Sequence, residues 1–167
     1  MRKLSIFILL FVLTKASIGH AKEDCLSISE KSVKVEAWVS KKYEQDYHKI
    51  RREFAEMGNT KVGLFFYPAE NPSRVVAIGR CIPAYMAQHF LKKAWKYSLG
   101  TTHLVHQGFV SSHWAGVGTS LFSEHSMSSI SPQQLNKLMD DTLDTESFHK
   151  IYRALTTQKE KVSAFGL

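Results

Sequence analysis

Cys81 is the side chain of this sequence with the strongest predicted reactivity. It follows Arg80 and lies at the start of a predicted helix that runs from about Ile82 to Ser98. A neighbouring positive charge and a helix N-terminus both lower the pKa of a thiol and favour the nucleophilic thiolate. His106 and His113 follow on predicted strands, and either imidazole could serve as the base of a Cys–His pair. The chemistry that this pattern indicates is thiol-based hydrolysis.

The order of these residues is similar to that of a known enzyme class. A cysteine that begins a helix is followed by a histidine that begins a strand, in the run His113-Trp114-Ala115-Gly116-Val117. At these two positions the chain resembles papain-like cell-wall peptidases and amidases. The resemblance implies a hydrolase of peptide or amide bonds, with Cys81 as nucleophile and His113 or His106 as base.

The first residues predict the compartment in which this chemistry would take place. Arg2 and Lys3 precede the apolar run Leu4 to Leu13, and the small residues Gly19 and Ala21 flank His20. This is the pattern of a cleavable signal peptide, and the apolar run is too short for a spanning helix. We therefore expect residues 1–21 to be removed and residues 22–167 to form one periplasmic or secreted domain. Loss of three basic residues with the signal lowers the net charge from +7 to +4.

Export gives Cys81 a second role. The chain has two cysteines, Cys25 and Cys81, and two cysteines in an oxidising compartment usually form a disulfide. Closing a loop of this length stabilises a fold by about 4 kcal/mol in the chain-entropy model. A paired sulfur cannot be a nucleophile, so the two roles exclude each other. We expect the disulfide, and with it no catalytic residue.

Histidines and glycines provide two weaker signals. A periplasmic metal-binding protein is an alternative, because five histidines and one glutamate lie close together in the sequence: His89, His103, His106, His113, His125 and Glu124. Residues three apart on a strand point to opposite faces, however, and no recognised ligand spacing occurs. We therefore expect no metal site and no cofactor. The segment that contains Gly116 and Gly118 lacks the lysine and the spacing of a phosphate-binding loop. We therefore expect these glycines to let a helix or an aromatic ring lie close to the backbone.

Hydrophobic periodicity places these residues on a series of elements. Alternation predicts a strand over Val33 to Val39, and the next helix ends at Gly58. Two further strands flank the turn-rich run Pro68 to Ser73 and should pair as a hairpin. The remaining predicted elements are a helix, two strands and two C-terminal helices: about Ile82–Ser98, Thr102–His106, His113–Phe122, and helices that begin after Ser131 and at Thr145. Ser131 and Gln134 should form a capping box, and the last helix should pack on the sheet through one apolar face: Phe148, Ile151, Tyr152 and Leu155.

This order predicts an α+β fold. Strand, helix, strand, strand, helix, strand is the βαββαβ order of ferredoxin-like folds, here with an extra strand and two C-terminal helices on an antiparallel sheet. In that topology the first and third strands are neighbours, which would permit Cys25 and Cys81 to pair. The run Phe65-Phe66-Tyr67 places rings on both faces of its strand, so one face needs a covering element, a partner or a ligand.

The leading functional prediction is an exported, non-enzymatic binding or accessory protein, such as an inhibitor or an immunity protein. Its partner would be another protein or a component of the cell envelope. A net charge of +4 and export argue against nucleic acid, and we expect no stable membrane insertion after the signal is cleaved. The thiol hydrolase is the alternative, and the metal-binding protein is a weaker one.

Overall fold

The computed structural model describes residues 25, 32–58, 60–67, 74–97, 101–119 and 122–157. The predicted signal peptide, residues 1–21, and the predicted turn, residues 68–73, lie outside the described residues. Among the described residues, no helix is both long enough and apolar enough to cross a bilayer.

A six-stranded sheet and four α-helices make up the described fold, which confirms the α+β class. The strands follow the spatial order β2-β1-β5-β3-β4-β6, and their bounds are β1 Val33–Ser40, β2 Thr60–Tyr67, β3 Val75–Ile78, β4 His103–Val105, β5 Trp114–Val117 and β6 Met127–Ser129. The helices are α1 Tyr47–Ala55, α2 Ala84–Tyr97, α3 Pro132–Leu138 and α4 Thr145–Thr157. Short 3-10 helices cover Lys41–Asp46, Gln107–Phe109 and Glu124–Ser126.

The sheet is mixed, so the predicted antiparallel sheet is wrong. Strand β1 runs parallel to β2 along their whole length and parallel to β5 on its other side. Strand β3 is antiparallel to β5 and parallel to β4, and β6 is antiparallel to β4. The predicted hairpin between β2 and β3 is also wrong, because β1 and β5 lie between them. Helix α1 supplies the crossover that a parallel β1–β2 pair requires. The ferredoxin-like order is therefore not found.

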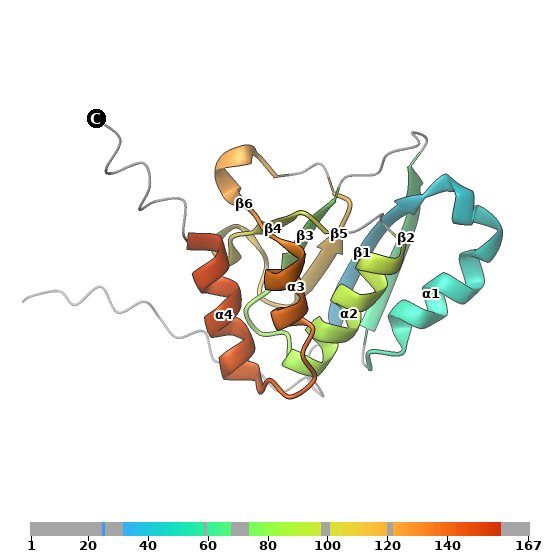
Figure 1. Cartoon of the computed structure of the whole chain (residues 1–167). Helices are drawn as coiled ribbons and strands as arrows, with labels where there is room; N and C mark the ends of the chain where they lie inside the picture. The colour runs from blue at the N-terminus through green and yellow to red at the C-terminus, as the bar shows by residue number, and fades with distance from the viewer. Residues whose placement is uncertain are drawn as a thin grey trace, which may run out of the picture.

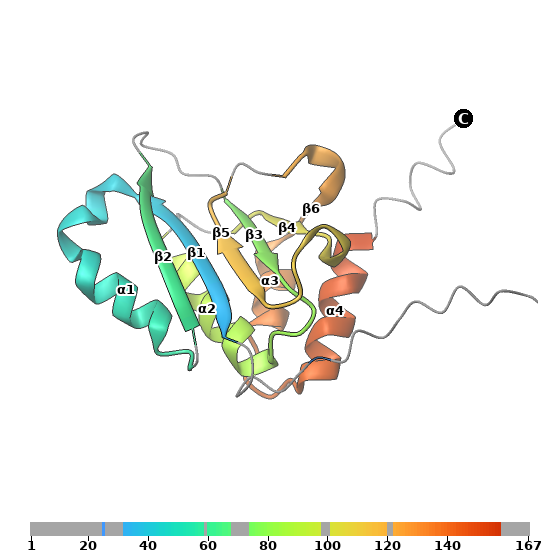
Figure 2. The same ribbon diagram turned by 180° about the vertical axis from the view of Figure 1, so that it is seen from behind.

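All four helices belong to one layer. In Figure 1 helices α2, α3 and α4 cover one face of the sheet and α1 lies beside β2. The same ribbon seen from behind presents the strands without a covering helix (Figure 2). We call this second face the open face. Strand β1 has the predicted alternation, because Val33, Val35, Ala37 and Val39 point into the helical side and are fully buried.

The helix layer packs through large apolar side chains. Phe54 of α1 is fully buried, and its ring lies 5.6 Å from that of Phe90 in α2. Gly58 follows α1 with a φ of +115° and donates its N–H to the Ala55 carbonyl. Only glycine adopts this backbone readily, so Gly58 ends the helix as the sequence predicts.

The two C-terminal helices cover the sheet as expected. Ser131 and Gln134 form the predicted capping box at the start of α3. Leu138 of α3 and Phe148 and Tyr152 of α4 are fully buried. The buried face of α4 also contains His149 and Thr156, two polar residues that hydrophobic periodicity does not select.

Candidate functional site

Cys81 is bonded to Cys25 in a disulfide with a Cα–Cα distance of 5.2 Å. Cys81 is buried, with 7% of its surface exposed. Cys81 therefore has no free thiol that could ionise, and it cannot act as a nucleophile while the disulfide is intact. The close approach of the two cysteines does not require the ferredoxin-like topology from which it was inferred.

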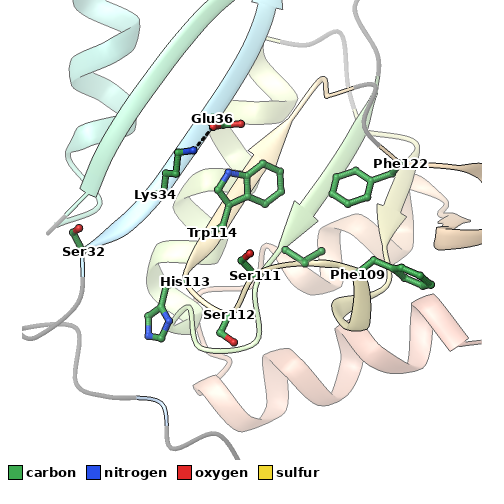
Figure 3. Close-up of a pocket in the computed structure, with 10 residues that line it drawn as sticks. Ser32, Lys34, Glu36, Phe109, Ser111, Ser112, His113, Trp114 and Phe122 are labelled. Atoms are coloured by element: carbon green, nitrogen blue, oxygen red, sulfur yellow. Dashed lines mark ion pairs between the residues drawn. The ribbon is translucent and has the colours of Figure 1, made fainter.

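The two histidines proposed as bases differ in their hydrogen bonds. The backbone N–H of Cys81 donates to the Ser112 carbonyl at 2.9 Å. His113 is the residue that follows Ser112 in the sequence. The His113 ring points away from Trp114 (Figure 3), and its Nε2 is buried without a hydrogen-bond partner among the described residues. His106 lies 3.1 Å from the Ser128 hydroxyl through its Nε2. The backbone bond between Cys81 and Ser112 thus brings the chain at His113 near Cys81.

The histidines of the metal-binding alternative bond to separate partners in the fold. His89 Nε2 lies 2.8 Å from the Glu53 carbonyl oxygen, and His103 Nδ1 lies 2.9 Å from the Thr102 hydroxyl. In the described part of the chain no three His, Cys, Asp or Glu side chains are grouped so that they could hold a metal ion. These histidines therefore contribute hydrogen bonds within the fold.

Strand register brings a different set of side chains together on the open face. Lys34 of β1 is the register partner of Lys61 on one side and of Trp114 on the other. One step along, Glu36 lies between Gly63 and Gly116, and beyond it Trp38 is paired with Phe65. The face consists of a row with two lysines and a tryptophan, a row with two glycines, and a row of aromatic residues.

Glycine allows the aromatic rings to lie close to the sheet. A β-carbon on Gly116 would overlap the six-membered ring of Trp114, and a β-carbon on Gly63 would lie 3.1 Å from the Phe65 ring. Both rings therefore lean over the glycine row. Trp38 stacks on Phe65 with ring centroids 4.7 Å apart and an angle of 21° between the planes. The position of the Trp114 ring over Gly116 confirms the prediction that this glycine admits a ring close to the backbone.

A groove of about 690 Å³ crosses this face beside Trp114 (Figure 3). We call it the aromatic groove, and it is lined by Ser32, Lys34, Glu36, Phe109, Val110, Ser111, Ser112, His113, Trp114 and Phe122. The rings of Trp114 and Phe122 are 6.1 Å apart at an angle of 52°, and Phe109 is 62% exposed. Lys34 Nζ lies 2.6 Å from Glu36 Oε1. The groove thus combines one exposed and two half-buried rings with charged and hydroxyl groups.

The wall of the groove is held by backbone hydrogen bonds around the 107–113 segment. The N–H of Lys34 donates to the His113 carbonyl, and the N–H of Gly79 donates to the Trp114 carbonyl, both at 2.9 Å. Gly79 lies so close to the backbone of Ser111 and Ser112 that a β-carbon would overlap it. This part of the groove is therefore attached to β1 and to the end of β3.

A buried polar network supports the same segment from the helical side. Gln107 Nε2 donates to His149 Nδ1 at 2.7 Å, and His149 Nε2 donates to the Ile82 carbonyl at 2.7 Å. These contacts define the neutral tautomer with its proton on Nε2. Burial lowers the pKa of His149, and the Ile82 hydrogen bond opposes this only in part. Tyr152 donates to the Val105 carbonyl at 2.9 Å, and burial raises the pKa of its phenol.

A second hollow adjoins the aromatic groove at Ser32 and Lys34. Its volume is about 580 Å³, and we call it the basic hollow, lined by Ser32, Lys34, Arg51, Ala55, Thr60, Lys61, Val62 and Gly63. Helix α1 contributes Arg51 and Ala55. Glu53 links this helix to α2: burial alone would raise its pKa, but hydrogen bonds from Lys93 and Lys96 lower it to about 2.

Comparison with known proteins gives no relative. No protein-family model, no curated protein and no solved structure matches this chain. A function can therefore be inferred only from the site itself.

Proposed function

We propose that the protein is an exported, non-enzymatic binding protein that holds a glycan of the cell envelope on its open face. The observation that carries this proposal is the aromatic groove, in which the Trp114 ring lies over Gly116 beside the Lys34–Glu36 ion pair. The Cys25–Cys81 disulfide supports a location outside the cytoplasm. It also removes the thiolate on which the hydrolase alternative depends.

The chemistry of the groove favours sugar over an apolar ligand. One face of a pyranose ring is rich in C–H groups and stacks on an aromatic ring, while the hydroxyls at its edge bond to polar side chains. Trp114 and Phe122 supply the rings, and Lys34, Glu36 and Ser111 supply charged and hydroxyl groups at the same groove. Binding sites in general combine apolar walls with a few polar groups that orient the ligand.

The form of the aromatic surface also favours sugar over a protein partner. A protein interface is built around side chains that insert into pockets of the partner. Here the rings of Trp114 and Phe65 lie over glycines, so they project only a short distance from the surface of the sheet. A chain of sugar rings is extended and presents flat surfaces, and it fits a groove of this kind.

The proposal predicts that the protein sediments with purified, protein-free cell-wall sacculi and that Trp114→Ala does not. Loss of a central aromatic contact costs about 2 kcal/mol or more, which corresponds to at least about thirtyfold in affinity. Trp95→Ala is the matched control, because Trp95 is 44% exposed on α2 in the helical layer. Binding is measured by centrifugation with the disulfide intact, and circular dichroism verifies that each variant is folded.

Two results would contradict the proposal. One is that the unmodified protein stays in the supernatant at every concentration of sacculi. The other is that Trp114→Ala sediments as fully as Trp95→Ala, since the open face would then have no part in binding.

A further inference from the structure

We infer that the ligand of the open face is an acidic oligosaccharide, with a carboxylate in the basic hollow and a neighbouring sugar ring on Trp114. This inference rests on the proposed function and adds the charge of the ligand and its orientation. The observation behind it is that the aromatic groove and the basic hollow share Ser32 and Lys34. One extended ligand could therefore occupy both.

The basic hollow has an excess of positive charge. Lys34, Arg51 and Lys61 line it, and none of the described residues that line it is acidic. Lys34 is already paired with Glu36 at 2.6 Å. Arg51 and Lys61 are exposed, and no ion pair joins either of them to an acidic side chain within the described ranges. The charge that a ligand would meet in this hollow is therefore that of Arg51 and Lys61.

Glu36 determines which end of the ligand carries the acid. Its carboxylate lines the aromatic groove and keeps 22% of its side chain exposed. A carboxylate on a sugar above Trp114 would lie near Glu36 and would be repelled. The same group in the basic hollow would lie near Arg51 and Lys61. The charge distribution thus places the sugar ring on Trp114 and the carboxylate beyond Lys34.

The distance between the two positions suits a short glycan. Lys61, Lys34 and Trp114 are register partners on β2, β1 and β5. Two strand spacings therefore separate Lys61 from Trp114, which is on the order of 10 Å. This is about the length of a disaccharide, so adjacent sugars could occupy the two sites. Thr60 begins β2 at the wall of the hollow, and its hydroxyl donates to the Ala55 carbonyl.

The test compares an aldobiouronic acid, a disaccharide of one uronic acid and one neutral sugar, with its methyl ester, so that the two ligands share a backbone and differ in one charge. Binding to the full protein is followed by tryptophan fluorescence at low salt. We expect the acid to bind about tenfold more tightly than the ester, since each exposed ion pair contributes about 0.2–1 kcal/mol. Raising the salt concentration should reduce this ratio, because it screens exposed charges.

A double variant assigns the effect to the basic hollow. Arg51→Gln with Lys61→Gln should bring the acid-to-ester ratio close to one and leave the affinity for the ester unchanged. The matched control is Lys137→Gln with Lys150→Gln, which removes two exposed charges from α3 and α4 in the helical layer. The control should keep the ratio of the unmodified protein.

The outcomes separate this inference from the proposed function. Equal affinity for acid and ester, or an unchanged ratio in the Arg51/Lys61 variant, would overturn the acidic ligand and leave glycan binding intact. Binding of sacculi without binding of either disaccharide would do the same. Failure to bind both the sacculi and the disaccharides would overturn both. Binding instead to vesicles of anionic phospholipid would identify the basic hollow as a membrane contact and contradict the inference.

Discussion

Removal of the Cys25–Cys81 disulfide should lower the free energy of unfolding by about 4 kcal/mol. The bond joins residues 56 positions apart, and in the chain-entropy model its main effect is to restrict the unfolded chain. Cys25→Ala, Cys81→Ala and the double variant should therefore lose similar amounts of stability. Urea unfolding of the four proteins, monitored by circular dichroism, gives these free energies.

Alkylation of the native protein provides the control for this prediction. With the bond intact, iodoacetamide should label neither cysteine in the absence of a reductant. Rapid labelling of Cys81 in native protein, together with unchanged stability of Cys25→Ala, would contradict the disulfide. It would also restore the hydrolase with Cys81 as nucleophile, since His113 follows the residue that accepts the Cys81 N–H bond.

Replacing His149 with leucine should cost about 1–3 kcal/mol, because this is the cost of a buried group left without its hydrogen bond. His149 is 4% exposed, and its two ring nitrogens bond to Gln107 and to the Ile82 carbonyl. Leucine removes the His149 donor from the Ile82 carbonyl, whereas the Gln107 amide keeps its bond to the Ile78 carbonyl at 3.3 Å. The change is measured by urea unfolding at pH 7.

The same residue predicts a pH dependence of stability between pH 7 and pH 5. Burial lowers the pKa of His149 in the folded state, whereas in the unfolded chain it is about 6.5. As the pH falls through 6.5, the unfolded state binds a proton that the folded state does not. Stability should therefore fall, by at most about 1.4 kcal/mol per pH unit.

His149→Leu should depend less on pH in this interval than the unmodified protein does, because it lacks the His149 contribution. Glu53, whose folded pKa is about 2, begins to lose its stabilising contribution only as the pH falls below its ordinary value of 4.5. Its effect therefore lies outside the interval. Equal slopes for the variant and the unmodified protein between pH 7 and pH 5 would contradict the assignment to His149.

The sequence indicated most of the elements but not their pairing. The alternation in Val33 to Val39 and the capping box at Ser131 are local signals, and both were predicted correctly. The turn-rich run 68–73 suggested a hairpin because consecutive strands often pair. In the fold, β2 instead pairs with β1 over eight residues. Which strand pairs with β2 depends on the arrangement of the whole sheet, and no local sequence pattern contains that information.

Two further misses have the same physical origin. Strand β6, Met127–Ser129, has no hydrophobic alternation, and it is a strand because it adds to the edge of β4. Helix α4 was expected to bury Ile151 and Leu155, which are only half-buried. His149 occupies the buried face because the Ile82 carbonyl and Gln107 satisfy its ring nitrogens, and the Thr156 hydroxyl is satisfied within the helix by the Tyr152 carbonyl.

Part of the candidate site could be anticipated from the sequence. The period of two in β1 already places Lys34, Glu36 and Trp38 on one face, and Gly116 was expected to admit a ring. Their meeting with Trp114 depends on the β1–β5 register. The linings of the two hollows also include residues from separate segments: Phe109 and Phe122 in the aromatic groove and Arg51 in the basic hollow. The types of these residues did not indicate this position.

The most direct test of the open face is an NMR titration that follows the indole N–H signals of the three tryptophans. Trp38 and Trp114 lie on the open face, and Trp95 lies on α2 in the helical layer. Soluble glycan fragments released from sacculi are added to the labelled protein, and Trp95→Phe assigns the third signal. We expect the Trp114 signal to shift most, the Trp38 signal to shift less, and the Trp95 signal to stay in place. A titration in which Trp95 alone shifts, or in which no indole signal moves at saturating fragment concentration, would contradict it.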